Sequence, residues 1–508
     1  MGDFAYTRLT ELDRSFLIYE GPSSPMHVGA VQIFDAAPLR SREGPIDFER
    51  LLEYVGSRVH LIPRYRQRVE AAPVGGHPIW VDDARFNLRY HVRHTRLPKP
   101  GDERLLKRQC ARILEQRLDL HKPPWEMWLV EGLAGDRVAL VSKTHHCMID
   151  GVSGVDLMSV LMTPEPLEKI DPPPVWLPRR APTAVEYAAS EAAARATAPL
   201  RAARTLARIV TDDGGARRDL VSRLEAAGHV VASALRPTTA TPLNQPVGPH
   251  RRFDWLPMSL EEIALVRRRL GGTLNDVVLA VAAGGIRRFF KYTRLTDPDN
   301  LEFKVMAPVS VRESGQRGKL GNRVSAWFVP LPIGERDPLA RLAKVREATD
   351  GLRRHHDALG AEAITQAVEW MGSTPIALGA RLLETGQPPF HMVITNVPGP
   401  RVPLYLLGAK MLEAHPMVPL MGNLSVGIAL FSYGGTLSWG FNADWEQVPD
   451  LHELVLAVQH SFAQLLERAK RAPEPPAAAA DAAAGRKIRK TAGPATRGTK
   501  RRRSAEDS

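Results

Sequence analysis

Residues 143–154 read KTHHCMIDGVSG and place two adjacent histidines directly after a strand-like run. The run VALVSKTHH predicts a β-strand that ends at His146. The following GVSGVDLMSVLM spaces Val155, Met158 and Leu161 as on one face of a helix. The histidines therefore fall in a strand-to-helix connection, where binding and catalytic residues are often carried.

The histidine pair does not fit a zinc-binding helix, because the glutamate and the second histidine of an HExxH pattern are absent. Cys147 is the immediate neighbour of His146 and is expected to point elsewhere, so a thiol nucleophile activated by that histidine is disfavoured. A histidine acting as a general base needs a substrate hydroxyl within reach. On these residues alone, two histidines that only pack or meet solvent remain an alternative.

The composition is that of a globular protein with a sizeable core: 508 residues, 44% hydrophobic and 24% charged. A run of about 18 apolar residues is absent, so no membrane-spanning helix is expected. The N-terminus also lacks the apolar core of a secretory signal. The two cysteines, Cys110 and Cys147, exclude a disulfide framework and favour a reducing, intracellular location.

The formal net charge of +12 raises the question of nucleic-acid binding. Nine Lys or Arg and four Asp or Glu lie in residues 472–508, so this short segment contributes +5 of the total. Its alanine-rich, proline-containing composition predicts disorder. No nucleic acid is expected as a partner, apart from a contact of this basic tail.

Strand-like and helical patterns alternate along most of the chain, which predicts an α/β protein. A proline-rich stretch near residue 165 cannot form continuous helix or a central strand. It is followed by an alanine- and arginine-rich helical pattern. The predicted organisation is an N-terminal lobe (1–165), a crossover linker (166–245), a C-terminal lobe (246–470) and a disordered tail (471–508).

Five spaced motifs occur along the chain: LDRSFL (12–17), PMHVG (25–29), PPW (123–125) with HHxxxDG (145–151), TLNDVVLAV (273–281) and NVPGP (396–400). In this order they resemble the motifs of the bacterial wax ester synthase/diacylglycerol acyltransferase family, a branch of the chloramphenicol-acetyltransferase-like superfamily. One motif departs from the family pattern, because Pro124 stands where leucine is usual. The resemblance covers about residues 8–468.

The resemblance implies two chloramphenicol-acetyltransferase-like lobes, each a mixed sheet with helices, and an active-site tunnel at their interface. It implies an acyl-CoA-dependent O-acyltransferase that esterifies diacylglycerol, a long-chain fatty alcohol, or both, with acyl-CoA as substrate and no cofactor. Two alternatives stay open. One is a condensation-type enzyme that uses carrier-bound acyl groups, and the other is a catalytically weak protein of lipid storage bodies.

Roles for the histidine motif follow from the same resemblance. His146 is expected to be the general base and His145 to shape the pocket or pack behind it. Asp150 is expected to brace the loop by pairing with an arginine, for which Arg312 is the candidate. Gly151 is expected to permit a tight turn and to offer a backbone N–H to the oxyanion.

The remaining motifs are expected to support the site. Asn275 and Asp276 either cap a helix, with Asn275 as N-cap, or bring that helix to the active site. Asn396, Pro398 and Gly399 are expected to support the interface between the lobes.

Trp125 is expected to belong to the core more than to contact substrate. The lipid acceptor implies peripheral association with the inner face of the membrane or with lipid inclusions of the cytoplasm. The arginine-rich segment 195–209 is a candidate for that contact, with a solvated helix between the lobes as the alternative.

Overall fold

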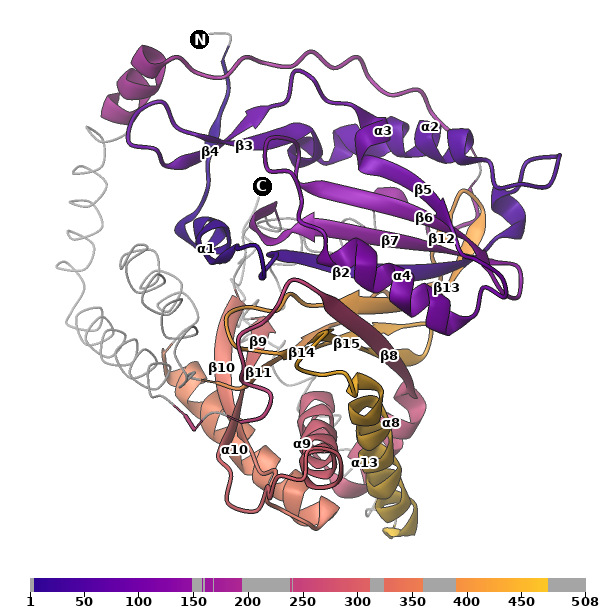
Figure 1. The fold of residues 1–508 in the computed structure, drawn as a ribbon, viewed down its shortest axis with the longest axis vertical. Coiled ribbons are helices and arrows are strands. Elements are labelled where there is room, and N and C mark those ends of the chain that lie inside the picture. Colours follow the sequence, from indigo (N-terminus) through magenta and orange to yellow (C-terminus); the bar gives the residue numbers. More distant parts are fainter. Residues whose placement is uncertain are drawn as a thin grey trace, which may run out of the picture.

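The computed structural model describes residues 4–148, 158, 160–167, 169–193, 238–239, 241–310, 324–359 and 390–473. They form two lobes, each built on a six-stranded mixed sheet with helices (Figure 1). This confirms the predicted α/β class and the two-lobed architecture. The arginine-rich segment 195–209 and the tail beyond residue 473 lie outside the described residues.

The N-terminal lobe contains the sheet β12-β13-β2-β7-β6-β5 and a small sheet β1-β4-β3. Strand β7 carries the run VALV, whose side chains alternate between two buried clusters on opposite faces of the sheet. One face packs against α4 and the other against α1 and α2. The strands are β1 (Thr7–Arg8), β2 (His27–Asp35), β3 (Gln67–Ala71), β4 (Pro78–Asp82), β5 (Val92–Arg96), β6 (Trp125–Leu133), β7 (Arg137–His145), β12 (Tyr405–Leu406) and β13 (Ala409–Met417).

The helices of this lobe are α1 (Glu11–Tyr19), α2 (Phe48–Arg58), α3 (Leu88–His91) and α4 (Glu103–Glu115). Its short 3-10 turns are η1 (Ala37–Leu39), η2 (Val59–Leu61), η3 (Pro63–Arg66) and η4 (His146–Met148). The C-terminal end of α4 is held by two buried side chains from the sheet. Lys143 Nζ donates to the carbonyl oxygens of Ile113 and Gln116, at 3.1 and 2.8 Å, and His27 Nε2 bonds the Leu114 carbonyl. These bonds satisfy carbonyls that a helix end leaves free.

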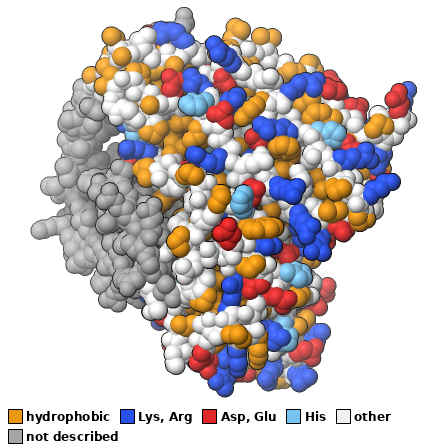
Figure 2. All heavy atoms as spheres, in the orientation of Figure 1, with side chains coloured by type: hydrophobic (Ala, Val, Ile, Leu, Met, Phe, Trp, Pro, Cys, Tyr) orange, Lys and Arg blue, Asp and Glu red, His pale blue; other side chains and the backbone are white. Residues whose placement is uncertain are grey.

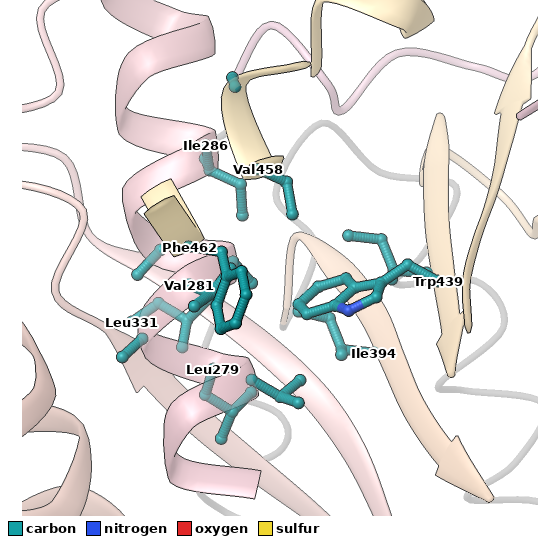
Figure 3. Packing of buried hydrophobic residues seen from close by; sticks show 14 of the residues in the cluster. Leu279, Val281, Ile286, Leu331, Ile394, Trp439, Val458 and Phe462 are labelled. Carbon is teal, nitrogen blue, oxygen red and sulfur yellow. The ribbon is translucent and has the colours of Figure 1, made fainter. Parts of the chain in front are cut away.

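The C-terminal lobe contains the sheet β10-β9-β11-β14-β15-β8. Four helices cover one face of it and enclose the largest apolar cluster, in which Trp439 of β15 faces Val281, Val458 and Phe462 (Figure 3). Its strands are β8 (Arg251–Ser259), β9 (Phe303–Ser310), β10 (Val324–Leu331), β11 (Met392–Val397), β14 (Val426–Tyr433) and β15 (Thr436–Asp444). Its helices are α8 (Leu260–Leu270), α9 (Leu274–Tyr292), α10 (Pro338–Leu359) and α13 (Leu451–Arg471).

Helix α9 is buried on nearly all sides, and a glycine pair lets α13 approach it closely. A Cβ on Gly285 would lie 2.5 Å from Val458 Cγ2, and one on Gly284 would lie 2.2 Å from Ser461 Oγ. Because such distances leave no room for a side chain, both positions require glycine for this packing.

The two lobes share strands in a way that the predicted boundaries do not follow. Strands β12 and β13 come from the C-terminal half of the chain, yet β13 pairs antiparallel with β2 of the N-terminal sheet. The proposed C-terminal lobe of residues 246–470 therefore includes an element of the other lobe. Strand β13 also packs against β14 and β15, which ties the two sheets together.

Candidate active site

His146 lies in a sharp turn at the end of a central strand. Strand β7 ends at His145, one residue earlier than predicted, and η4 begins at His146. Three consecutive backbone N–H groups here have acceptors: His145 N donates to the Pro124 oxygen at 2.9 Å and His146 N to the Met26 oxygen at 2.8 Å. Cys147 N donates to His145 Nδ1 at 3.2 Å. The backbone that carries the histidines is thus held at three consecutive residues.

The imidazole of His146 stacks on the ring of Phe16 from α1, with 3.7 Å between ring centroids and 17° between planes. Its Nδ1 is buried and has no hydrogen-bond partner among the described side chains. Burial lowers the pKa of His146 to about 4; its own backbone acts in the opposite direction, and nearby His145 lowers the pKa further. The ring is therefore neutral near pH 7, as a general base requires.

His145 is fully buried, and both of its ring nitrogens are engaged within the protein. Nε2 lies 3.0 Å from Glu20 Oε2, and Nδ1 faces the N–H and Sγ of Cys147. Since Nδ1 accepts the Cys147 N–H, Nε2 is the nitrogen that donates to the Glu20 carboxylate. The prediction that placed His145 among the catalytic residues is therefore corrected. Both nitrogens of its ring are bonded within the protein, so neither is free to meet a substrate. It packs behind His146 and supports the turn.

Glu20 is a member of the site that the sequence did not single out. Its side chain is only 2% exposed, and Arg117 Nε lies 3.4 Å from its carboxylate. Burial alone would raise the pKa of Glu20, but the hydrogen bond from His145 and the charge and hydrogen bond of Arg117 hold that pKa below its ordinary value. The residue is therefore an ionised carboxylate beside the histidine motif.

Cys147 is buried, and burial raises the pKa of its thiol well above the ordinary value. A thiol that stays protonated is a poor nucleophile. This agrees with the expectation that Cys147 is not the nucleophile.

Asp150, Gly151 and Arg312 lie outside the described residues. The ion pair between Asp150 and Arg312, the turn at Gly151 and the tunnel between the lobes therefore stay predictions.

The structure brings the Asn-Asp helix and the NVPGP block together. Asn396 Nδ2 donates to Asn275 Oδ1 at 2.7 Å, which joins the end of β11 to the first turn of α9. The sequence predicted Asn275 as the N-cap of α9, and that prediction is wrong. Thr273 takes that position and forms a capping box with Asp276, whose carboxylate accepts from the Thr273 N–H at 2.7 Å.

Asp276 is buried and does more than cap the helix. Its Oδ1 also accepts from Thr349 Oγ1 at 2.7 Å and from Arg353 at 3.1 Å, both on α10. It therefore locks α9 to α10.

Gly399 lies tight against β14 in the loop that follows Pro398. Its N–H donates to Ser432 Oγ at 3.1 Å, and an added Cβ would lie 2.0 Å from the Ser432 carbonyl oxygen. The NVPGP block therefore fixes a close contact of backbones at the end of the C-terminal sheet.

Trp125 is a core residue in the structure. Its ring is stacked between Tyr65 and His91, each at 4.6 Å, and its Nε1 donates to the Tyr65 carbonyl at 2.9 Å. The side chain is 1% exposed, so packing alone accounts for its placement.

Across the part of the chain that the structure describes, no cluster of three or more His, Cys, Asp or Glu is arranged to hold a metal ion. On the face shown in Figure 2, Lys and Arg side chains are interspersed with acidic and apolar ones.

Residues 9–278 match the family described as the wax ester synthase/diacylglycerol acyltransferase catalytic domain, and residues 320–466 match its C-terminal domain. A Mycobacterium tuberculosis protein named as a diacylglycerol O-acyltransferase is 31% identical over 92% of both chains. Another from the same species is 30% identical and covers 91% of this chain and 96% of the relative.

Among solved structures, the wax ester synthase/diacylglycerol acyltransferase from Marinobacter aquaeolei VT8 is similar with a TM-score of 0.65 and 25% identity, covering 91% of this chain and all of that one. The first condensation domain of the calcium-dependent antibiotic synthetase shares the fold, with a TM-score of 0.54 and 17% identity over 93% and 98% of the two chains. The chain therefore belongs to the wax ester synthase/diacylglycerol acyltransferase family and is an acyltransferase.

Proposed function

We propose that this acyltransferase esterifies a lipid hydroxyl with the acyl group of acyl-CoA, and that His146 is its general base. The acceptor is diacylglycerol, a long-chain fatty alcohol, or both. The observation that carries the proposal is the neutral imidazole of His146, held on a rigid turn at the end of β7.

The proposed reaction is a direct transfer. The neutral His146 ring takes the proton of the acceptor hydroxyl while that oxygen attacks the thioester carbonyl. The tetrahedral intermediate collapses by breaking the carbon–sulfur bond, and the imidazolium returns its proton to the departing thiolate. Because Nδ1 is enclosed, Nε2 is the nitrogen proposed to exchange this proton.

Three residues outside the described ranges complete the proposal. Asp150 braces the loop through Arg312, because a buried carboxylate needs a partner of opposite charge. Gly151 lets the chain turn and offers its N–H to the oxyanion, a stabilisation that is worth about 3 kcal/mol where it has been measured.

We also propose that the enzyme works at a lipid surface, since its acceptors reside there. No helix of the described residues is long and apolar enough to cross a membrane. Val175 and Leu177 are 92% and 80% exposed, and they lie on an extended stretch along the outer side of the N-terminal lobe (Figure 1). Apolar side chains that project in this way suit insertion at a membrane interface.

Incubation of the purified chain with radiolabelled palmitoyl-CoA and either diolein or hexadecanol tests the reaction. The proposal predicts a labelled ester with at least one acceptor. Absence of ester from both acceptors would overturn it.

A further inference from the structure

One face of α1 lies against the turn that carries His146. Asp13, Phe16 and Glu20 are spaced three and four residues apart, so they project from the same side of the helix and its C-cap. Asp13 is 3% exposed and acts electrostatically on Cys147, Phe16 stacks on His146, and Glu20 bonds His145. A single helix face therefore meets all three residues of the turn.

Glu20 reaches the backbone of the turn through one imidazole. Its carboxylate accepts from His145 Nε2 at 3.0 Å, and His145 Nδ1 accepts from the Cys147 N–H at 3.2 Å. Both side chains are 2% exposed or less. Hydrogen bonds to an ionised group in such surroundings are about twice as strong as neutral ones. The end of α1 is thus fastened to the residue that follows His146.

Phe16 acts on the other side of the same turn. Its ring lies nearly parallel to the imidazole of His146, which limits rotation of that ring and keeps water from one of its faces. The ring plane decides where the proton-accepting nitrogen points.

We propose that Phe16 and Glu20 are positioning residues for His146: Glu20 fixes the turn through His145, and Phe16 fixes the plane of the imidazole. The inference rests on the proposed role of His146 as the base. Among the described residues, the charged or titratable groups around the turn are Asp13 of α1 and its C-cap Glu20, His27 of β2, Arg64 of η3, Arg117 after α4, and His145 and Cys147 of the turn itself.

The test compares Phe16→Leu, Glu20→Gln and His146→Ala in the full-length enzyme. Arg14→Gln is the matched control, because Arg14 lies on α1 and only pairs with Glu11 near the surface. Misplacement of a reacting group by about 1 Å costs about 100-fold in rate. Phe16→Leu and Glu20→Gln should therefore lower kcat by about 10- to 100-fold, with KM within about threefold, when each variant is assayed at a temperature where it is fully folded. Arg14→Gln should leave kcat unchanged.

A pH profile and a double mutant separate positioning from a merely structural role. Phe16→Ala opens one face of the imidazole to water, so the acid limb of kcat/KM should move up toward the pH of free imidazole, about 6.5. Glu20→Gln in the His146→Ala background should cause no further loss of rate, because its effect runs through His146.

The outcomes are distinct. Wild-type kcat in both Phe16→Leu and Glu20→Gln, together with an inactive His146→Ala, would overturn the positioning role alone. A further loss in the double mutant would also overturn it. Wild-type activity in His146→Ala would instead overturn the proposed base.

Discussion

His146 owes its placement and its protonation state to different parts of the chain. Its backbone N–H is bound by Met26, just before β2, while its ring is covered by Phe16 of α1. Burial stabilises the neutral ring, because the imidazolium would lose hydration there. A neutral ring accepts a proton without first having to release one.

The first prediction concerns the pH dependence of the rate. Because the pKa of His146 is lowered to about 4, the base stays unprotonated as the pH falls from 7 to 5. The value of kcat/KM should be flat over that range and should decline below it, with a midpoint near pH 4. Rates measured at each pH, with recovery of activity checked at pH 7, test this. A midpoint at pH 6.5 would contradict it.

The second prediction concerns Lys143, which is 1% exposed and pairs with Glu126 at 3.2 Å. Lys143→Met removes this pair and leaves two carbonyls of α4 without their donor. It should lower the free energy of unfolding by about 3 kcal/mol, measured by urea denaturation. Lys122→Met, which breaks the exposed pair with Asp119, is the control and should destabilise the protein much less, because solvent screens that pair. Equal effects would contradict the account.

At the residue scale, the sequence indicated His146 and His145 but not the contacts that Phe16 and Glu20 make with them. The HHxxxDG motif is contiguous and could be recognised, and Trp125 was expected in the core. Glu20 and Phe16 are 125 and 130 residues away from the histidines that they contact, so no local pattern joins them. In the sequence, Glu20 resembles any polar residue at the end of a surface helix.

At the scale of elements, the first turn of α9 links three parts of the C-terminal lobe. Asp276 closes the capping box and also bonds α10, while Asn275 reaches β11 through Asn396. The sequence predicted a helix here and chose Asn275 as its N-cap. Thr273 and Asn275 are both good cap residues, so propensity alone could not decide between them.

The third prediction tests the double role of Asp276. Asp276→Ala loses the cap and leaves Arg353 without its partner on α9, so the free energy of unfolding should fall by about 2 kcal/mol. Asn275→Ala, which removes one partly exposed hydrogen bond, should cost about 0.5 kcal/mol. Thermal denaturation of both variants measures this. A larger loss of stability in Asn275→Ala than in Asp276→Ala would contradict the double role of Asp276.

At the scale of the whole molecule, β13 is one of the elements that join the two lobes, together with α4, which packs against β8. It extends the N-terminal sheet while it packs on β14 and β15 of the other. Alternation of strands and helices predicted two sheets, but which strand joins which sheet depends on pairing between distant segments. Residues 409–417 lie after most of the C-terminal sheet in the sequence, and nothing local assigns them to the first lobe.

The fourth prediction concerns a close contact between β15 of one sheet and β13 of the other. A Cβ on Gly440 of β15 would lie 1.7 Å from the Pro416 carbonyl oxygen of β13. Gly440→Ala must push the two strands apart and should destabilise the protein by about 3 kcal/mol. Gly21→Ala is the control, since an added Cβ there meets no atom within 4 Å. If the two variants melt at the same temperature, the sheets are not coupled at this contact.

The central claim is that His146 is the base of the acyl transfer, and its most direct test is the rate of ester formation by His146→Ala. Loss of a general base costs about 100- to 10,000-fold in rate. The account predicts a fall of kcat in that range with an unchanged melting temperature. A variant that folds normally and retains kcat within about threefold of the wild type would contradict the account.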